Sequence, residues 1–270
     1  MKIHSEKLFL LPALIAGLGL ILAGRATAQT FTNLYSFTAT SGSSSTNSDG
    51  AGPGSLILSD NTLYGTAGGG GTNGTGTAFA LNTNGTGFMT LHSFTARSGS
   101  LSTNSDGAYP NDGLILSGNT LYGTAGEGGT NGTGTVFKVN TNGTGFTNLH
   151  SFTAISVSYP STNSDGAYPG AGLILSGNTL YGTALDGGTN GTGMVFGVNT
   201  DGTGFTNLHT FTAGVYNSSH RYTNSDGFYP QAGLILSGNT LYGTAYGGAV
   251  RAMARCSVLR WDQSARRRRP

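Results

Sequence analysis

Cysteine is almost absent from this sequence, which has only Cys256, close to the C-terminal end. The residues before it therefore form no disulfide with one another and offer no thiolate ligands for a metal ion. Stability has to come from backbone pairing and from an apolar core. A chain of 270 residues is long enough to bury such a core.

Charged residues are also scarce, at 9% of the chain, and most of the basic ones lie at its two ends. Three Lys or Arg precede residue 29 and seven fall in the last twenty residues, which leaves Arg97, Lys138 and Arg221 between them. Nine acidic residues share that middle part, so its net charge is about −6. Because nucleic-acid binding needs a basic surface, this composition argues against a nucleic-acid partner.

Long apolar runs are missing except at the N-terminus, where Leu8–Gly24 follows two lysines. Ala26–Ala28 then supplies the small residues that a signal peptidase recognises. The pattern predicts a secretory signal peptide over residues 1–28, with cleavage before Gln29. A retained anchor is the alternative, but the run is short for a membrane span of about 20 residues. We expect an exported protein (extracellular, cell-surface or periplasmic) with no membrane span after cleavage.

Glycine is abundant, with 47 copies, and many of them belong to an internal repeat. The nonapeptide Ser-Gly-Asn-Thr-Leu-Tyr-Gly-Thr-Ala occurs three times, and a fourth copy has Asp60 in place of its first glycine. The tyrosines of the four copies lie 58, 59 and 61 residues apart, at Tyr64, Tyr122, Tyr181 and Tyr242. A fixed period of this size indicates one supersecondary unit copied along the chain.

Each unit is predicted to contain four short strands. In the unit 113–154, apolar or alternating runs at 114–117, 120–125, 135–140 and 146–154 are separated by Ser-Gly-Asn, a glycine-rich loop and Asn-Gly. The apolar residues of the last run do not share one face, which predicts a β-bulge. Antiparallel strands joined by tight turns are typical of a propeller blade, with a parallel β-solenoid as the alternative.

We therefore predict an all-β, propeller-like array of four-stranded antiparallel blades over residues 29–248. It would contain three complete units and partial units at both ends. Phe31–Ala39 matches a lone fourth strand, and Leu234–Ala245 supplies a first and a second strand. Such a combination is how a propeller ring is closed, but the third strand of the last unit is missing from the sequence.

Residues 249–270 no longer follow the repeat, contain the only cysteine and tryptophan, and end in four arginines and a proline. If the reading frame is shifted near Ala249, degenerate codons permit the missing glycine loop and third strand. We predict an aberrant, disordered basic tail that results from a lost reading frame. A genuine arginine-rich tail that contacts an anionic surface is the alternative, and the coding DNA distinguishes the two.

The units also resemble a known family. Leu-Tyr-Gly-Thr, Gly-Gly, Gly-Thr-Val-Phe-Lys-Val, Asn-Gly-Thr-Gly-Phe and Leu-His-Ser-Phe follow one another in Leu121–Phe152, and Asp-Gly-Ala-Tyr-Pro occupies Asp106–Pro110. In this order they resemble the GloVer tandem repeats of secreted bacterial proteins, over about residues 31–248. The resemblance implies export and one of several choices of C-terminal anchor, of which we recognise none in this sequence. It implies no particular activity.

The loops that differ most between the units are the candidate binding surface, because variable loops on a repeated scaffold commonly bind ligands. Aromatic and carboxylate side chains there would suit a carbohydrate. For the repeated aspartates and tyrosines, a structural role is the stronger expectation, since Asp-Gly forms turns. The candidate ligand-binding residues are Asp106, Tyr109, Asp165, Tyr168, Asp226, Tyr229, Glu127 and Asp186.

No cofactor and no metal site are expected. The Asn-Ser-Asp-Gly loops and Asn199–Gly202 lack the ligand alternation and the closing glutamate of a calcium loop, so calcium is only a weak alternative. His92, His150 and His209 occupy one position in successive units, which places them too far apart to share an ion.

No Ser–His–Asp order, nucleotide-binding loop or close carboxylate pair stands out from the repeat. We expect a structural or binding scaffold rather than an enzyme, with extracellular polysaccharide or cell-surface components as its partners. One alternative is a polysaccharide-cleaving enzyme built on a propeller, for which Glu127 and Arg221 break the repeat without evident partners. Another is a truncated copy without function.

Overall fold

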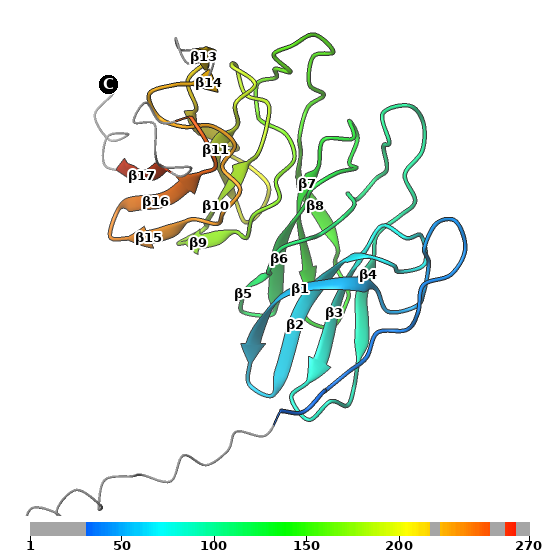
Figure 1. The fold of residues 1–270 in the computed structure, drawn as a ribbon. Helices are drawn as coiled ribbons and strands as arrows, with labels where there is room; N and C mark the ends of the chain where they lie inside the picture. Colours follow the sequence, from blue (N-terminus) through cyan, green and yellow to red (C-terminus); the bar gives the residue numbers. More distant parts are fainter. Residues whose placement is uncertain (1–30, 217–221, 249–256, 263–270) are drawn as a thin grey trace, which may run out of the picture. The chain divides into compact units, whose positions relative to one another are not determined.

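The computed structural model describes residues 31–216, 222–248 and 257–262, which form strands, turns and loops (Figure 1). The predicted signal peptide at 1–28, Arg221 and most of the tail 249–270 lie outside the described residues. The described residues from Leu34 onward belong to one compact unit.

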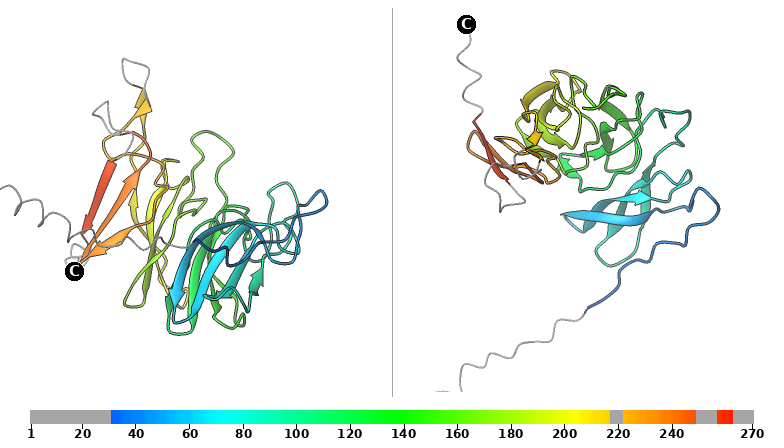
Figure 2. Two further views of the ribbon diagram at one scale, coloured as in Figure 1. Left: turned by 60° about the horizontal axis from the view of Figure 1, so that its bottom comes forward. Right: turned by 45° about the horizontal axis from the view of Figure 1, so that its top comes forward.

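Three four-stranded sheets follow one another along the chain (Figure 2). The first consists of β1 (Ala51–Ser59), β2 (Thr62–Gly69), β3 (Thr77–Asn82) and β4 (Met89–Ser93). The second consists of β5 (Ile115–Ser117), β6 (Thr120–Ala125), β7 (Thr135–Asn140) and β8 (Thr147–Ser151). The third consists of β9 (Ile174–Ser176), β10 (Thr179–Ala184), β11 (Met194–Asn199) and β12 (Thr206–Thr210).

Within each sheet the strands pair antiparallel in sequence order, so the predicted all-β architecture of four-stranded blades is confirmed. The predicted bulge is also present. Val136 pairs with His150 and Phe137 with Asn148, which leaves one extra residue, Leu149, in β8. The same register shift occurs in the first and third sheets. The local bend lets both Leu149 and Phe152 be buried although they have opposite parity.

The nonapeptide forms the tight turn between the first two strands of each sheet. Gly118 takes a φ of 56° there, and Asp60 takes 50° at the same position of the first unit. Gly123, further along β6, has a different reason to be glycine. A Cβ there would lie 2.7 Å from Phe137 and 2.8 Å from Leu114, both of which are buried. Only a glycine allows this close approach between strand and neighbouring side chains.

The apolar core lies between consecutive sheets rather than within one. Phe94 and Leu91 of the first unit pack with Leu121, Phe137 and Val139 of the second, and equivalent clusters join the second unit to the third and the third to the last. Each unit therefore covers the hydrophobic face of its neighbour, as expected for a repeat array.

Aromatic rings reinforce each junction. The ring of His92 stacks on Phe146 of the next unit at 3.6 Å, and Phe94 contacts Phe137 edge to face at 5.3 Å. His150 and Phe152 repeat both contacts with Phe205 and Phe196. His92 and His150 thus pack between successive units.

The N-terminal segment differs from the prediction, because residues 31–39 do not form a strand. Tyr35 and Phe37 nevertheless contact Phe88 and Phe79 at 4.2 and 5.2 Å, as His92 and Phe94 contact the second unit. A fourth strand needs a third strand beside it, and the described chain provides none before β1. Phe31, at the start of this segment, is 97% exposed.

The last unit contains a hairpin of β13 (Val215–Tyr216) and β14 (Tyr222–Thr223), and a sheet of β15 (Ile235–Ser237), β16 (Thr240–Ala245) and β17 (Ser257–Asp262). β17 pairs with the whole of β16, at the place of the missing third strand. These six residues belong to the predicted tail 249–270, whose origin in a lost reading frame stays a prediction. The edge of β16 offers unpaired backbone groups, with which an added strand can form hydrogen bonds.

Candidate functional site

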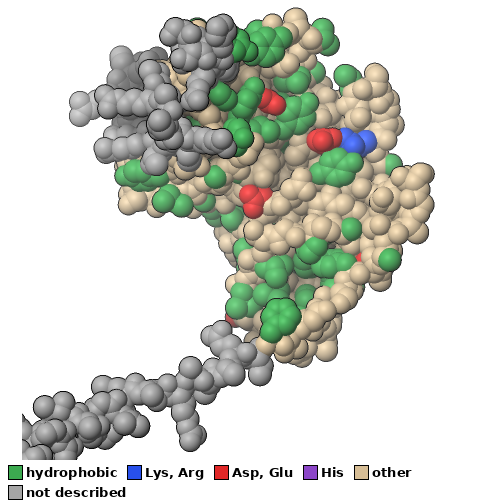
Figure 3. Space-filling model, viewed as in Figure 1, with side chains coloured by type: hydrophobic (Ala, Val, Ile, Leu, Met, Phe, Trp, Pro, Cys, Tyr) green, Lys and Arg blue, Asp and Glu red, His purple; other side chains and the backbone are tan. Residues whose placement is uncertain are grey.

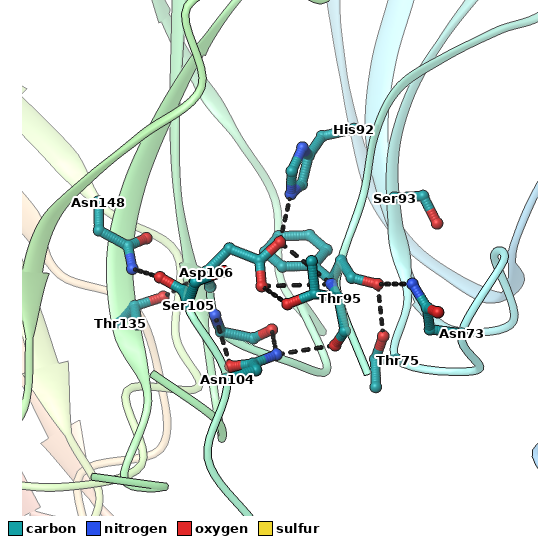
Figure 4. A network of polar contacts seen from close by, with 12 residues as sticks. Asn73, Thr75, His92, Ser93, Thr95, Asn104, Ser105, Asp106, Thr135 and Asn148 are labelled. Atoms are coloured by element: carbon teal, nitrogen blue, oxygen red, sulfur yellow. Dashed lines mark hydrogen bonds and ion pairs between the residues drawn. The ribbon is translucent and has the colours of Figure 1, made fainter. Parts of the chain in front are cut away.

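The repeated aspartates are structural. In Asp106 both carboxylate oxygens accept hydrogen bonds from the backbone N–H of Thr95, at 3.1 and 3.2 Å, and one also accepts the Thr95 hydroxyl (Figure 4). Nε2 of His92 lies 2.8 Å from the other oxygen. The side chain is buried, so these contacts compensate for the loss of water. Asp106 therefore closes the long loop that leads into the second unit.

The same closure recurs at every junction. Asp165 binds Thr153 and His150, and Asp226 binds Thr212 and His209. Burial alone would raise the pKa of Asp165, but the hydrogen bonds from His150 and Thr153 outweigh it and lower that pKa. We call these arrangements the aspartate clasps. They remove Asp106, Asp165 and Asp226 from the set of residues that can contact a ligand.

The first copy of the clasp has a tyrosine in place of the histidine. The Tyr35 hydroxyl donates to Oδ2 of Asp49 at 2.7 Å, and the Thr38 N–H donates to the same oxygen. Burial, the hydrogen bond and the negative charge of Asp49 together raise the pKa of Tyr35 to about 12. The clasp therefore forms with either ring, provided that the ring supplies a donor.

An asparagine completes each clasp. The Asn104 amide donates to the carbonyls of Thr95 and Gly107 and accepts from the N–H groups of Gly107 and Gly129, at 2.7 to 3.0 Å (Figure 4). It thus joins the variable loop to the glycine-rich loop. Sequence reasoning did not single out this residue, although the invariable spacing of Asn and Asp in Thr-Asn-Ser-Asp-Gly carries the signal.

The backbone of each candidate tyrosine bridges two units. The Tyr109 N–H donates to the Thr75 carbonyl of the preceding unit at 2.8 Å, and its own carbonyl accepts from Gly126 at 3.1 Å. Tyr168 and Tyr229 make the equivalent bonds to Thr133 and Thr192. All three have a φ near 58°, which is uncommon for tyrosine. Their backbones are thus engaged between units, and all three residues are partly exposed.

A pocket lies at each of the first two junctions. The first has a volume of about 540 Å³ and is lined by Ser43–Ser45, Asn73–Thr75, Ala96, Arg97, Ser102 and Tyr109. The second, of about 400 Å³, is lined by Ser100–Ser102, Asn131–Thr133, Ala154, Ile155, Tyr168 and Glu127. Both combine one tyrosine with hydroxyl, amide and backbone groups of the variable and glycine-rich loops. Figure 3 shows one face of the molecule, on which charged side chains are few.

Glu127 does have a partner, which corrects the expectation from the sequence. It forms an ion pair with Arg97, which lies 30 residues earlier in the chain. The Arg97 guanidinium carbon also lies 4.5 Å from the centroid of the Tyr109 ring, and Nη2 donates to the Tyr109 hydroxyl at 2.8 Å. Arg97, Tyr109 and Glu127 therefore form a closed triad, in which Arg97 and Tyr109 line the first pocket and Glu127 lines the second.

Tyr168 lines the second pocket, and Asp186, which is not one of the lining residues, lies near enough for its charge to act on this tyrosine. Burial raises the pKa of Tyr168, and the negative charges of Asp186 and Glu127 raise it further. Burial also raises the pKa of Asp186. Within the described part of the chain the Asp186 carboxylate accepts no hydrogen bond and faces no basic side chain. Asp186 and Tyr168 are thus the candidates that the structure leaves free for a ligand.

The weak calcium alternative finds no donor set among the described residues, where no three His, Cys, Asp or Glu side chains converge. In the Asn199–Gly202 loop, the Asp201 carboxylate accepts the N–H and the hydroxyl of Thr203 at 2.9 and 2.6 Å. Those hydrogen bonds lower the pKa of Asp201 and define an ordinary turn. Nor does any helix in the described ranges have the length and apolarity to cross a membrane.

Residues 19–252 match the repeat described as the Gloeobacter/Verrucomicrobia repeat. The chain belongs to this family. The match confirms the resemblance found in the sequence, and it ends where the repeat pattern stops. A search of curated proteins finds no match.

Solved structures give weaker likenesses to this family member. The nidogen in a nidogen/laminin complex is the first, at 14% identity over 79% of this chain and 76% of that chain, with a TM-score of 0.39. TolB from Acinetobacter baumannii is 10% identical over 76% of this chain and 39% of its own, with a TM-score of 0.42. The GH74 enzyme of Niastella koreensis is 17% identical over 79% of this chain and 29% of its own, with a TM-score of 0.46. The chain thus spans between 29% and 76% of these structures.

Proposed function

We propose that this repeat protein is exported and acts at the cell surface as a scaffold that binds extracellular polysaccharide without cleaving it. The observation that supports the proposal is the pair of equivalent pockets at the first two junctions. Each is of a size suited to a small ligand, and each offers one partly exposed tyrosine ring beside several hydroxyl and amide groups. A sugar ring can stack on the tyrosine while its hydroxyls bind the loop groups.

The distribution of carboxylates favours binding over hydrolysis. Glycosidases use a pair of carboxyl groups that flank the scissile bond. Here Asp106 and Asp165 are held in the clasps, and Glu127 is paired with Arg97. Among the acids of these loops that the structure describes, Asp186 is the one whose carboxylate has no hydrogen-bond or ionic partner. The expected export rests on the signal pattern of residues 1–28.

A glycan-array screen of the secreted full chain, beside an assay of reducing-sugar release, tests the proposal. We expect saturable binding without turnover. Tyr168→Ala should weaken it at least about tenfold, because the stacked ring contributes its buried area and about 0.5–1.5 kcal/mol of stacking energy. Tyr109→Ala should weaken it less, because Arg97 already covers one face of that ring. The control is Tyr216→Ala, which changes an exposed tyrosine outside both pockets. Turnover, or binding that survives both pocket substitutions, would refute the proposal.

A further inference from the structure

The first junction holds a cation of its own. The guanidinium of Arg97 covers the face of Tyr109, donates to its hydroxyl and pairs with Glu127. A cation over an aromatic face, beside a carboxylate, is a favourable arrangement that satisfies all three groups. The three residues come from the variable loop, from the Tyr-Pro step and from the residue pair after β6.

The second junction has the same backbone arrangement, with a tyrosine and a carboxylate, but no arginine at the position of Arg97. By repeat position, Tyr168 corresponds to Tyr109 and Asp186 to Glu127, whereas Ile155 replaces Arg97. The backbone confirms the correspondence. Ala167 and Asp186 exchange hydrogen bonds at 2.9 and 3.1 Å, as Ala108 and Glu127 do at 2.7 and 3.0 Å. The φ of Tyr168 is 57°, against 58° for Tyr109. A ring and a carboxylate therefore stand on the same frame in both places.

The electrostatics of the second junction are unbalanced as a result. Asp186 is half-buried and has no partner within the described chain, and burial raises its pKa. The charges of Asp186 and Glu127 both act on the Tyr168 hydroxyl. None of the residues that line the second pocket is basic. Because Arg97 already pairs with Glu127, Asp186 is the carboxylate whose charge a cation entering from outside would compensate.

The pocket has room for such a ligand. Its volume of about 400 Å³ opens beside Tyr168 and Ile155, and its walls include Ser100–Ser102 and Asn131–Thr133. Glu127, which is paired with Arg97, also lines it, whereas Asp186 lies outside the lining. Those groups can bind the hydroxyls of a sugar while an ammonium group lies on the tyrosine. At the third junction Gly214 and Gly247 occupy the positions of Arg97 and Glu127, so these two positions carry no charge there.

We propose that the second junction binds a sugar with a free ammonium group, which takes the place of the Arg97 guanidinium over the Tyr168 ring and beside the Asp186 carboxylate. The proposal rests on the proposed function and specifies its ligand class: a polysaccharide that contains unacetylated amino sugars. Neutral or N-acetylated glycans lack the positive charge and gain nothing from this pair of residues.

Calorimetry on the full chain tests the inference with three probes: a glucosamine tetrasaccharide, its N-acetylated counterpart and a neutral glucose tetrasaccharide. We expect the unacetylated probe to bind at least about tenfold more tightly than the other two at moderate salt. Asp186→Asn should abolish this preference. Asp201→Asn removes an exposed acid remote from the pocket and should leave the preference intact, which controls for general charge attraction.

Two substitutions exploit the repeat. Ile155→Arg supplies the missing cation from within the chain and should block the ammonium probe. Arg97→Ile removes the resident cation from Tyr109 and Glu127 and should create a second site for the same probe. Equal binding of all three probes, or an Ile155→Arg variant that binds normally, would overturn the inference while the proposed polysaccharide binding stands. Binding of no probe and no array glycan would instead overturn the proposed function, and this inference with it.

Discussion

Removal of one aspartate clasp is the most direct test of how the units are joined. In Asp165→Ala, the Thr153 N–H, the Thr153 hydroxyl and the His150 ring lose their common partner. A hydrogen bond to a charged group contributes about 1.5–3 kcal/mol, but the burial of the carboxylate offsets part of that. We expect the substitution to lower the free energy of unfolding by about 3 kcal/mol, at the lower end of the range for breaking a buried pair.

Urea unfolding followed by circular dichroism measures the change, and hydrogen exchange locates it. The loop 155–164 should lose protection first, because the clasp closes it. Asp201→Ala is the matched control, since Asp201 also accepts two hydrogen bonds from a threonine but is exposed. Its effect should be much smaller. An unchanged urea midpoint and unchanged loop protection in Asp165→Ala would refute the structural assignment.

The stability of the same variant relative to wild type should depend on pH, because folding lowers the pKa of Asp165. The pKa of Asp165 is lower in the folded chain than its ordinary value of 3.8, so the unfolded chain takes up the proton first as the pH falls. The stability supplied by this carboxylate is therefore complete above the ordinary pKa. It is lost as the pH falls below 3.8 through the folded-state value. Wild type and Asp165→Ala should approach one another in stability over that acidic range alone.

Three further predictions concern packing and charge. Phe152→Ala should lower the free energy of unfolding, measured in urea, by about 3–5 kcal/mol. Phe152 is fully buried, and its ring centroid lies 5.4 Å from that of Phe196 in the next unit. Equal stability would contradict a core between units. Gly123→Ala should cost about 1–3 kcal/mol through its clash with Phe137, whereas Gly118→Asn, in open space at a φ of 56°, should cost far less. Asp186→Asn should raise the melting temperature at pH 7, because burial raises the pKa of Asp186 and penalises its charged form. The gain should disappear below pH 3.8, where the carboxyl group is protonated in both the folded and the unfolded chain. A lower melting temperature at pH 7 would mean that the carboxylate has a stabilising partner.

The periodic features of the fold were open to prediction from the sequence. Strand positions, turns and even the bulge in β8 follow from local patterns that recur in each unit. A pattern that is present in every copy is a more reliable signal than one that occurs in a single segment. The lone strand at 31–39 was wrong for a non-local reason: a strand is defined by its neighbour, and the described chain supplies none there. The pairing of β17 likewise depends on the edge of β16 rather than on a repeat motif.

The site residues were harder to interpret, because their roles depend on contacts between loops. The sequence places Asp106 in a turn, but not the loop closure that buries it against Thr95 and His92. Arg97, the partner of Glu127, lies 30 residues earlier and occurs in one unit alone, so no repeat pattern predicts the pair. The sequence did indicate that any function lies where the copies differ. Tyr168 and Asp186 were among its candidates, and the structure distinguishes them from the aspartates of the clasps.

The contacts that join the units are the same at each junction, whereas one residue of the variable loop differs. One repeat can therefore present different side chains on the same backbone. The clasp, the bridging tyrosine backbone and the inter-unit core recur at each junction, so the frame does not depend on the residue that follows Thr-Ala in the variable loop. That residue is Arg97 at the first junction, Ile155 at the second and Gly214 at the third. With a tyrosine and an acid opposite, arginine fills the position from within and isoleucine leaves it open. We therefore expect a single substitution, Arg97→Ile or Ile155→Arg, to switch a junction between a closed triad and a site for an ammonium group, at little cost to the fold.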